Sequence, residues 1–215
     1  MNILIEYQYF PSVTLFKILF KTKHIQFEQY ETYQKASFRN RMVIASPLGP
    51  VNLSIPVLGG RNTRVPVNQV EIDYREPWQS HHLKTLKNYY NRSPWFNHYL
   101  PELEELYLHQ QPRLLVNWNR LCFEWACRKL AIPVKITETD SYRKNVIGEE
   151  VIDLRGYFLP GNYSDPVKLA PFKPPVYCQV YEEKTGFLPN LSIADLIFCE
   201  GPAATGCFST GNDIG

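Results

Sequence analysis

Residues 3–29, ILIEYQYFPSVTLFKILFKTKHIQFEQ, decide the fold of this chain. The stretch opens with a β-prone run, which Phe10-Pro11-Ser12 separates from VTLFKILFK, where apolar residues recur at helical spacing. HIQFEQ then supplies a second β-prone run. A strand, a crossover helix and a second strand form a right-handed unit with parallel strands. We therefore expect an α/β sheet that begins with a β-α-β unit.

Further strands are expected after this unit. MVIAS (42–46) and VNLSIPV (51–57) flank Pro47-Leu48-Gly49-Pro50, a turn sequence that favours a β-hairpin. LGGRNTRVP (58–66) is expected to form an exposed loop, and VNQVEIDY (67–74) one more strand. Together with the β-α-β unit, these segments predict a mixed sheet.

From Pro77 onward the apolar spacing becomes three and four residues, which predicts a helical middle. The helical segments are 77–93, 100–109 and 113–132. The prolines expected to bound them are Pro94 and Pro101 between the first two, Pro112 at the start of the third and Pro133 after it.

The last third is rich in proline and is expected to wrap the domain. It contains KITETDSY (135–142) and VYCQVYEE (176–183) as expected short strands, and LSIADLIFCEG (191–201) as an expected short helix. The glycine-rich end has no periodicity and is expected to be flexible. We therefore predict one α/β domain over residues 1–204, followed by a flexible tail over residues 205–215.

The composition favours one folded domain without a general affinity for polyanions. Hydrophobic residues make up 44% of the 215 residues, which is enough apolar mass for a core. The 23 basic and 21 acidic residues nearly balance, so no general field attracts nucleic acid. No apolar run approaches the ~20 residues that span a bilayer, and no signal-peptide pattern opens the chain. We expect a cytoplasmic protein that neither binds nucleic acid nor inserts into a membrane.

The cysteines predict thiols rather than a metal site. The chain has five, an odd number, and no C-x-x-C pair. The histidines are not placed to complete a set of metal ligands. We therefore expect reduced thiols in the core or on the surface, and no metal centre. The cysteines are Cys122, Cys127, Cys178, Cys199 and Cys207.

The first candidate site is the polar segment Tyr33-Gln-Lys-Ala-Ser-Phe-Arg-Asn-Arg41. Guanidinium groups bind phosphate or carboxylate in a bidentate manner, and loops near the carboxyl ends of parallel strands commonly bind ligands. An anionic small molecule is therefore the expected ligand. The alternative is a solvated charged linker with no ligand. The candidate ligand-binding residues here are Lys35, Ser37, Arg39, Asn40 and Arg41.

The second candidate site lies in the first helix of the middle segment, at Trp78-Gln-Ser-His81-His82. Histidine titrates near neutral pH, so His82 is a candidate general acid or base. Tyr90, about two turns further along, is a candidate ligand contact. The alternative for these residues is that they belong to the core, as is common for large aromatic side chains.

The third candidate site is Gly186-Phe-Leu-Pro-Asn190-Leu-Ser192-Ile-Ala-Asp195. Asn190 and Ser192 are candidate ligand contacts, but either can instead cap the helix that follows. Asp195 lies in an apolar helix, so it is either a functional acid or a carboxylate that pairs with a buried partner. The nucleophile-elbow glycines of a hydrolase, a P-loop and a G-x-G-x-x-G sequence are all absent. No cofactor is therefore assigned.

Several ordered stretches along the chain resemble the WbqC-like family. They are Tyr9-Phe10-Pro11, 33–41, 78–82, YNRSPWF (90–96), Asn119-Arg-Leu121, Tyr177-Cys-Gln179 and FLPNLSIADLIFCEGP (187–202). The resemblance implies a role in assembling bacterial surface glycans such as O-antigen or capsule. Members often have His-Gln-Pro after the first strand, where this chain has Ile5-Glu6-Tyr7. A role for that histidine is therefore not carried over. A fold-level likeness to nucleotidyltransferases further implies that a helix N-terminus could hold phosphate.

Two classes of function follow from these observations. In the first, the protein is a transferase, or the partner of one, acting on a sugar-nucleotide or an activated acyl or aminoacyl donor. Lys35, Arg39 and Arg41 then hold the anion, Asn40 and Asn190 orient polar groups, and His82 or Asp195 handles protons. In the second, the protein is a non-catalytic binding or scaffold protein that docks a glycan-assembly enzyme.

Overall fold

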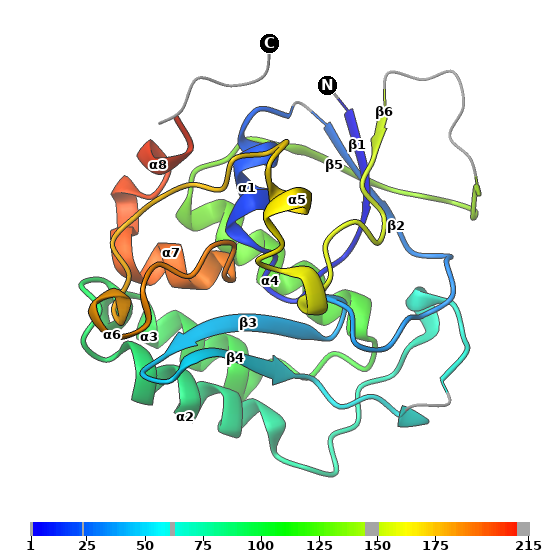
Figure 1. Cartoon of the computed structure of the whole chain (residues 1–215). Helices are drawn as coiled ribbons and strands as arrows, with labels where there is room; N and C mark the ends of the chain where they lie inside the picture. Colours follow the sequence, from blue (N-terminus) through cyan, green and yellow to red (C-terminus); the bar gives the residue numbers. More distant parts are fainter. Residues whose placement is uncertain (1, 23, 61–62, 145–150, 210–215) are drawn as a thin grey trace.

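The computed structural model describes residues 2–22, 24–60, 63–144 and 151–209. Four parallel strands form one sheet with the order β5-β2-β1-β6. The strands are β1 (Asn2–Glu6), β2 (His24–Glu28), β5 (Lys135–Glu138) and β6 (Val151–Asp153). Figure 1 shows this sheet near the N-terminus, with helices against one side of it. The α/β class predicted from the sequence is confirmed.

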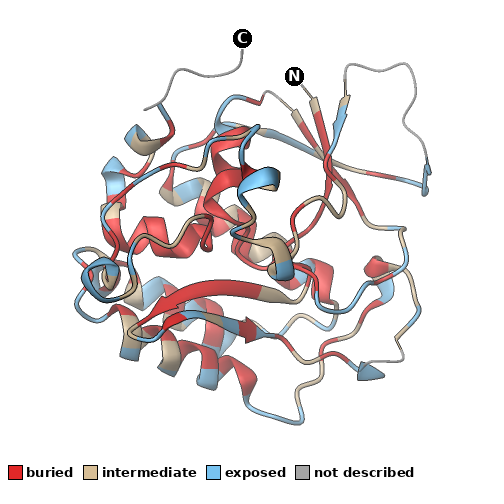
Figure 2. Cartoon of the chain, viewed as in Figure 1, coloured by how far each residue is buried: buried red, intermediate tan, exposed pale blue. Residues whose placement is uncertain are grey.

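The first two strands and α1 (Val13–Phe20) form the predicted β-α-β unit. β1 pairs with β2 in parallel register, with Ile3 opposite Ile25, and both side chains are fully buried. Every residue of α1 from Val13 to Leu19 is also buried, so the helix lies within the molecule rather than on its surface. Figure 2 shows α1 and the centre of the sheet as buried. This unit therefore forms part of the central core.

The predicted hairpin is present as β3 (Arg41–Ser46) and β4 (Gly49–Ser54), which pair antiparallel. Gly49 has φ +110°, a conformation that favours glycine, at the tight turn. The hairpin is a sheet of its own and does not join the parallel strands. Parallel and antiparallel pairing thus lie in two separate sheets rather than in one mixed sheet. Figure 1 shows the hairpin between α7 and α2.

Three helices make up the middle of the chain, as predicted: α2 (Trp78–Tyr90), α3 (Phe96–Glu104) and α4 (Leu115–Lys129). A π-helical turn, η3 (Glu105–His109), continues α3. The predicted break at Pro101 is wrong, because this proline lies inside α3 with its ring exposed to solvent. None of the helices among the described residues is long and apolar enough to cross a bilayer.

The last third wraps the domain with short elements. They are η4 (Pro160–Asn162), α5 (Pro166–Leu169), α6 (Glu182–Thr185), α7 (Ile193–Glu200), η5 (Gly201–Ala203) and α8 (Gly206–Ser209). Part of the expected tail is therefore helical, and Phe208 of α8 is fully buried, with its ring 5.5 Å from that of Phe20. Residues 210–215 of the expected tail lie outside the described residues.

Two predicted strands do not form. Residues 67–74 contain a 3-10 turn, η2 (Val67–Gln69), and only isolated bridges at Glu71 and Ile72. Residues 176–180 show strand-like alternation, with Tyr177 buried and Val176 exposed, but no strand of the described residues pairs with them. The side-chain amide of Gln179 instead bonds both backbone groups of Leu188, at 2.8 Å each. Both segments read as strands in the sequence, but neither pairs with a neighbouring strand in the described part of the chain.

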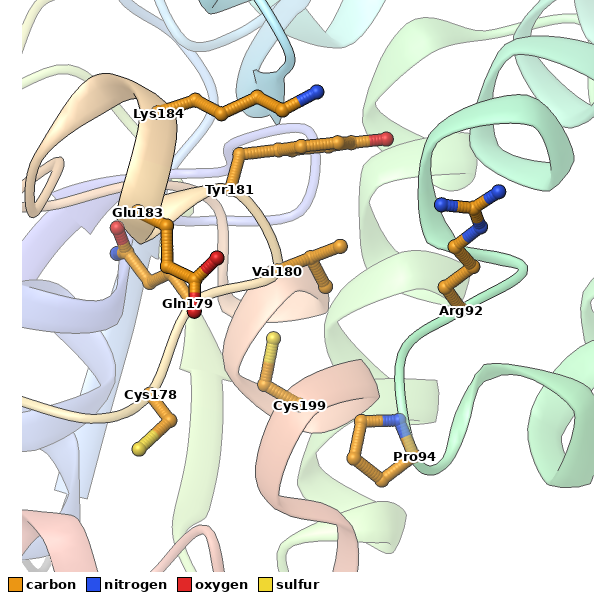
Figure 3. Close-up of a pocket in the computed structure, with 9 residues that line it drawn as sticks. All are labelled: Arg92, Pro94, Cys178, Gln179, Val180, Tyr181, Glu183, Lys184 and Cys199. Atoms are coloured by element: carbon orange, nitrogen blue, oxygen red, sulfur yellow. The ribbon is translucent and has the colours of Figure 1, made fainter.

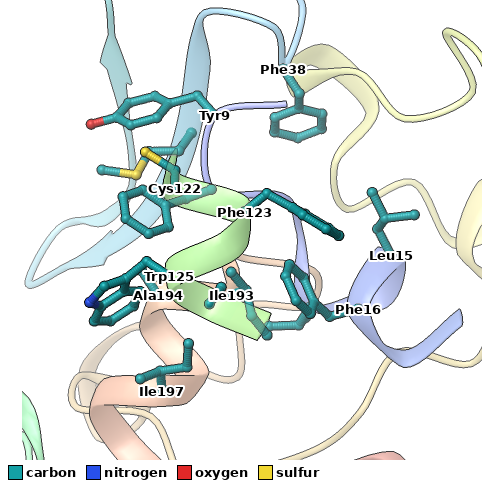
Figure 4. Close-up of a cluster of buried hydrophobic side chains, with 14 of the residues drawn as sticks. Tyr9, Leu15, Phe16, Phe38, Cys122, Phe123, Trp125, Ile193, Ala194 and Ile197 are labelled. Atoms are coloured by element: carbon teal, nitrogen blue, oxygen red, sulfur yellow. The ribbon is translucent and has the colours of Figure 1, made fainter. Parts of the chain in front are cut away.

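The core is centred on α7, whose residues from Ile193 to Cys199 are all buried. Figure 4 shows Ile193, Ala194 and Ile197 beside Trp125 of α4 and Phe16 of α1. Phe16 and Phe123 approach to 5.5 Å between ring centroids. A helix near the C-terminus thereby joins helices from the start and the middle of the chain into one core.

Candidate functional site

A hollow of about 520 Å³ lies between the segment that follows β2 and the end of β4. This volume is within the range of small-molecule sites, roughly 300–1,000 Å³. Its polar lining consists of Tyr33, Lys35, Asn40, Arg41 and Ser54. Three of the predicted ligand-binding residues, Lys35, Asn40 and Arg41, therefore share one hollow.

Of the residues that the structure describes, two cations and no acidic side chain line the hollow. Among the residues that the structure describes, neither Lys35 nor Arg41 forms an ion pair. The Nε atom of Arg41 is buried and has no hydrogen-bond partner in the described chain. This atom is out of reach of a ligand, but an anionic group in the hollow can pair with the charges of Lys35 and Arg41, which no described carboxylate neutralises.

Neutral polar groups stand beside these cations. The Nδ2 atom of Asn40 donates to the Ile55 carbonyl at 2.9 Å, and the Ile55 amide donates to the Asn40 carbonyl at 2.8 Å. The Oδ1 atom of Asn40 is buried without a partner among the described residues. Burial raises the pKa of Tyr33 to about 12 although Arg39 and Arg41 lower it, so the phenol keeps its proton at neutral pH.

Arg39 belongs to the predicted cluster but does not line the hollow. Its side chain is fully buried and forms ion pairs with Glu31 and, at 3.8 Å, with Glu6. The Nδ2 atom of Asn119 donates to the Arg39 carbonyl at 2.7 Å. Arg39 thus anchors the segment to the sheet edge, while the next two residues in the chain face the hollow. Ser37 is buried as well, and its Oγ donates to the Gln34 carbonyl at 2.6 Å within a turn.

Each parallel strand ends on an acidic residue: Glu6, Glu28, Glu138 and Asp153. Parallel strands bring their carboxyl ends to one edge of the sheet, so these acids line that edge. Glu6 and Glu28 are opposite each other in register, and both are fully buried. This acidic row was not predicted from the sequence: Glu6, Glu28 and Glu138 lie within expected strands, but residues 151–153 were not expected to form a strand.

Arginines from three distant segments neutralise the acidic row. Arg39 faces Glu6, as described above, and Arg155 bonds Glu28 at 3.2 Å and Asp153 at 2.6 Å. Arg120 forms an ion pair with Glu138, and the Tyr7 hydroxyl donates to the same carboxylate at 2.8 Å. A buried carboxylate is costly without such partners. The negative charges at this edge of the sheet are thus balanced by arginines.

This layer of paired charges fills the position where α/β sheets commonly bind ligands. With the strand order β5-β2-β1-β6, the reversal of direction falls between β1 and β6. There the Glu6 carboxylate accepts from Gln8 Nε2 at 2.9 Å and from the Gly156 amide at 3.0 Å. Burial raises the pKa of Glu31, and the nearby Arg39 opposes this shift. The protein's own groups occupy the crevice, and the open hollow lies along the segment that carries Arg39.

His82 is buried in an aromatic environment. Its Nδ1 lies 3.0 Å from the Tyr9 hydroxyl, which also contacts the Tyr107 hydroxyl. The imidazole also bonds the backbone of Ser54, but burial is the larger effect and lowers the pKa of His82 to about 4. The ring is therefore neutral at physiological pH. Because both polar contacts engage the neutral ring, this position favours a structural role for His82.

Asp195 is fully buried between two tyrosines. The Tyr90 hydroxyl donates to Oδ1 at 2.5 Å, and the Tyr177 hydroxyl donates to Oδ2 at 2.6 Å. Burial raises the pKa of Asp195 to about 6, and the two tyrosine hydrogen bonds oppose this shift. The backbone amide of Ala45 donates to the Tyr90 hydroxyl at 3.0 Å. The predicted ligand contact Tyr90 therefore belongs to a buried polar cluster.

Asn190 and Ser192 act as caps. The Asn190 Oδ1 accepts from the Thr14 amide at 3.2 Å, and the Leu191 carbonyl accepts from the Val13 amide at 2.8 Å. Ser192 caps α7 through the Ala194 amide and donates to the Phe10 carbonyl at 2.9 Å. The N-terminus of α1 is thus closed by protein groups. It does not offer free amides to a phosphate.

The three predicted clusters do not share one hollow. Arg41 pairs with Ser54 at the open end of the hairpin, whereas Ala45, which bonds Tyr90, lies near its turn. A strand rises about 3.3 Å per residue, so four residues correspond to roughly 13 Å. The Asp195 cluster therefore lies at the other end of the hairpin from the hollow. His82 is nearer, because it bonds the backbone of Ser54.

A second hollow, of about 340 Å³, lies between the end of α2 and the segment that leads into α6. Figure 3 shows Arg92 on one wall, with Tyr181 and Lys184 on the other. Glu183 also lines it, so the charges of this hollow are mixed. An anion is better matched by the first hollow, where no acid is found among the described lining residues.

All five cysteines are free thiols, as predicted. Burial raises the pKa of Cys122 well above its usual range, so this thiol is not ionised at neutral pH. Among the described residues, no three histidine, cysteine, aspartate or glutamate side chains come together as a metal site.

Comparison with known proteins gives one match. Residues 7–170 match the sequence model described as the WbqC-like protein family. The hollow formed by residues 33–60 lies wholly within this range. No curated protein and no solved structure matches the chain.

Proposed function

The chain belongs to the WbqC-like protein family, and on that premise we propose that it binds a small anionic molecule in the cationic hollow during the assembly of bacterial surface polysaccharide. The resemblance to the WbqC-like family supports the part of this proposal that concerns the assembly of surface polysaccharide. We propose a cytoplasmic location as part of the same function. The position of the hollow within the matched residues supports the choice of site.

One observation carries the proposal. Lys35 and Arg41 line a hollow without acidic side chains and have no ion-pair partner among the described residues. Arg39, the residue before Asn40 in the chain, is by contrast paired with carboxylates. Cations that face each other without a counter-charge repel, and an anion between them removes that repulsion. The hollow is therefore suited to phosphate or carboxylate.

We propose that the ligand is the donor of a transferase reaction, either a sugar-nucleotide or an activated acyl or aminoacyl compound. A sugar-nucleotide releases a nucleoside phosphate, and cations fixed beside the leaving group stabilise its growing negative charge. Lys35 and Arg41 would supply that stabilisation, and Asn40 and Tyr33 would orient the ligand. Proton transfer by His82 or Asp195 is not included, because neither lines the hollow.

A non-catalytic binding or scaffold protein is the second candidate. It is favoured by the lining of the hollow, in which the described residues include no histidine, cysteine or carboxylate to act as a general base. Phosphorus NMR of UDP-glucose with the protein separates the two. Broadened signals without new species indicate binding alone, whereas free UDP in the presence of an acceptor indicates transfer.

The role of Arg41 in anion binding can be tested with inorganic phosphate. Inorganic phosphate should raise the melting temperature of the protein, because a ligand that binds only the native state stabilises it. Replacing Arg41 with alanine should abolish most of this rise, since it removes one of two cations. The measurement is a thermal-shift titration with phosphate at constant ionic strength.

Arg75→Ala is the matched control for this experiment. Arg75 is exposed, pairs with Asp73 and lies outside the hollow, so its loss removes the same charge elsewhere. The Arg75→Ala protein should respond to phosphate like the wild type. An equal response of Arg41→Ala and Arg75→Ala would contradict the proposed site.

A further inference from the structure

A hydrogen bond from the buried His82 reaches the wall of the cationic hollow at Ser54, the last residue of β4. We infer that His82 is a positioning residue for the anion site, because it holds the backbone of Ser54 and, with it, the neighbouring Arg41. In this role His82 acts through Ser54 and does not touch the anion. The inference rests on the proposed function, since it concerns the same hollow.

The pairing of the hairpin places Arg41 and Ser54 side by side. They are opposite each other in the antiparallel register, and both line the hollow. The Ile55 amide donates to the Asn40 carbonyl at 2.8 Å, so residues 40 and 55 form a hydrogen-bonded pair. Along an antiparallel ladder such pairs alternate with pairs that exchange no backbone hydrogen bond but bring their side chains closer together. Arg41 and Ser54 are therefore a close pair, and a shift of one displaces the other.

The same alternation explains why Ser54 needs a partner outside the hairpin. Its carbonyl points away from β3, towards the outer edge of β4, where no further strand pairs in the described part of the chain. The contact with Ser54 opposes the lowering of the His82 pKa, as an acceptor of the ring proton does, so the imidazole donates to this carbonyl. Loss of the imidazole would remove that donor, which is unfavourable where water is excluded.

The neighbours of His82 hold its ring in place. The Tyr9 hydroxyl lies 3.0 Å from Nδ1, which leaves Nε2 as the nitrogen that donates to Ser54. The rings of Tyr9 and Trp78 pack against the imidazole, with centroid distances of 5.8 Å and 5.1 Å. The ring can therefore neither turn over nor withdraw without breaking these contacts.

Tyr9 also contacts the opposite wall of the hollow. One wall is formed by residues 33–41 and the other by the residues from Ser54 onward. The backbone amide of Tyr9 donates to the Phe38 carbonyl at 2.8 Å, within the first wall, and its hydroxyl contacts His82, which holds the second. Tyr9 and His82 thus fix both walls relative to the same part of the core.

The test measures the affinity of the full chain for inorganic phosphate by isothermal titration calorimetry at pH 7.5. His82→Leu removes the donor to Ser54 and keeps a buried apolar side chain in its place. A site that becomes ordered only on binding has a lower affinity, and one hydrogen bond corresponds to roughly a two- to tenfold change in Kd. We expect His82→Leu to bind phosphate at least about threefold more weakly than the wild type.

Two further variants separate positioning from a loss of stability. His82→Gln presents an amide N–H to Ser54 and should restore the wild-type Kd to within about twofold. Gly201→Ala is the matched control, because a Cβ atom there would overlap with Trp95 and destabilise the protein at a position that does not line the hollow. It should bind phosphate like the wild type. If His82 served stability alone, the folded His82→Leu protein would also bind like the wild type.

Different results overturn different claims. If phosphate binds through Arg41 but His82→Leu binds it equally well, the anion site stands and the positioning inference fails. The inference also fails if His82→Gln or Gly201→Ala binds as weakly as His82→Leu. If the wild type does not bind phosphate, the proposed function fails and the inference fails with it.

A second variant decides the inference should His82→Leu not fold. Tyr9→Phe removes only the hydroxyl that fixes the imidazole through Nδ1 and leaves the packed ring in place. The proton of the imidazole is then no longer held on Nε2, so the bond to Ser54 is weakened. We expect phosphate to bind Tyr9→Phe at least about twofold more weakly than the wild type, and an unchanged Kd would overturn the inference.

Discussion

His82 and Asp195 are buried titratable side chains whose pKa values move in opposite directions on folding. Burial favours the neutral form of each, which lowers the pKa of the histidine from 6.5 to about 4 and raises that of the aspartate from 3.8 to about 6. As the pH falls from 6.5 to 4, the unfolded chain protonates His82 first, which destabilises the fold. Over nearly the same range the folded chain protonates Asp195 first, which stabilises it.

We predict that these two contributions to the free energy of unfolding largely cancel between pH 7 and pH 4. Each shift of about two units corresponds to roughly 3 kcal/mol. His82→Gln keeps a donor and an acceptor but does not titrate, so it should lose less stability than the wild type between these pH values. Asp195→Asn should lose more stability than the wild type. Urea unfolding at pH 7 and pH 4 measures both differences.

His81→Gln is the control for this comparison, since His81 is exposed beside His82 on the same helix. It should follow the wild-type pH dependence. A wild-type pH dependence in His82→Gln or Asp195→Asn would show that these side chains are not buried as described.

At the scale of the element, the two ends of α7 depend on unusual backbone conformations. Asn190 has φ +60° ahead of the Ser192 cap, and its side chain closes the N-terminus of α1. At the other end Gly201 has φ +54°, and a Cβ atom there would overlap with the Trp95 ring. The Trp95 amide donates to the Phe198 carbonyl at 3.0 Å, so the end of α7 and the start of α3 are held together.

Gly201→Ala should destabilise the protein by about 2–4 kcal/mol. The left-handed conformation and the overlap with Trp95 both oppose a side chain at this position. Gly206→Ala is the control, because a Cβ atom added there would meet nothing within 4 Å and its φ is ordinary. It should change stability by less than about 0.5 kcal/mol. Urea unfolding of the two variants measures the contrast, and equal stabilities would contradict the close approach.

At the scale of the whole molecule, α7 closes a core whose other parts come from the first two thirds of the chain. The Ser192 amide donates to the Val43 carbonyl of the hairpin at 2.8 Å, and the Ile193 amide donates to the Pro11 carbonyl at 2.7 Å. The side chains of α7 from Ile193 to Cys199 are buried against α1, α3, α4 and β3. The residues that match the family model end at 170, whereas the core also includes α7, which follows later in the chain.

A chain that ends at residue 170 should therefore not fold cooperatively, although it contains all the matched residues. Removal of α7 exposes apolar surface on several helices at once and removes Asp195, the acceptor of the Tyr90 hydroxyl. Thermal unfolding followed by circular dichroism, together with binding of a hydrophobic dye, measures this. A chain that ends at residue 209 is the control and should unfold as sharply as the full chain. A sharp transition in the shorter chain would show that α7 is dispensable.

At the scale of the site, the local sequence pattern located the cationic residues. It did not indicate which of their side chains face the hollow and which face the sheet. The segment 33–41 was correctly identified as rich in anion-binding groups, and Lys35, Asn40 and Arg41 do line a hollow. Arg39 lies two residues from Arg41, yet it is fully buried against Glu6 and Glu31. Which of the two faces the sheet depends on its buried partners: Glu31 is close in sequence, but Glu6, which β1 brings to the edge, lies more than thirty residues away.

The sequence by itself determined the β-α-β unit, the hairpin, the helical middle and the position of the cationic segment. These depend on periodicity, turn chemistry and composition, which act between neighbours in the chain. Only the tertiary structure decided that His82 and Asp195 are buried, that α1 is capped by Asn190, and that arginines from three segments neutralise the sheet edge. Burial and ion pairing depend on which distant segments come together, and a local pattern holds no information about those partners.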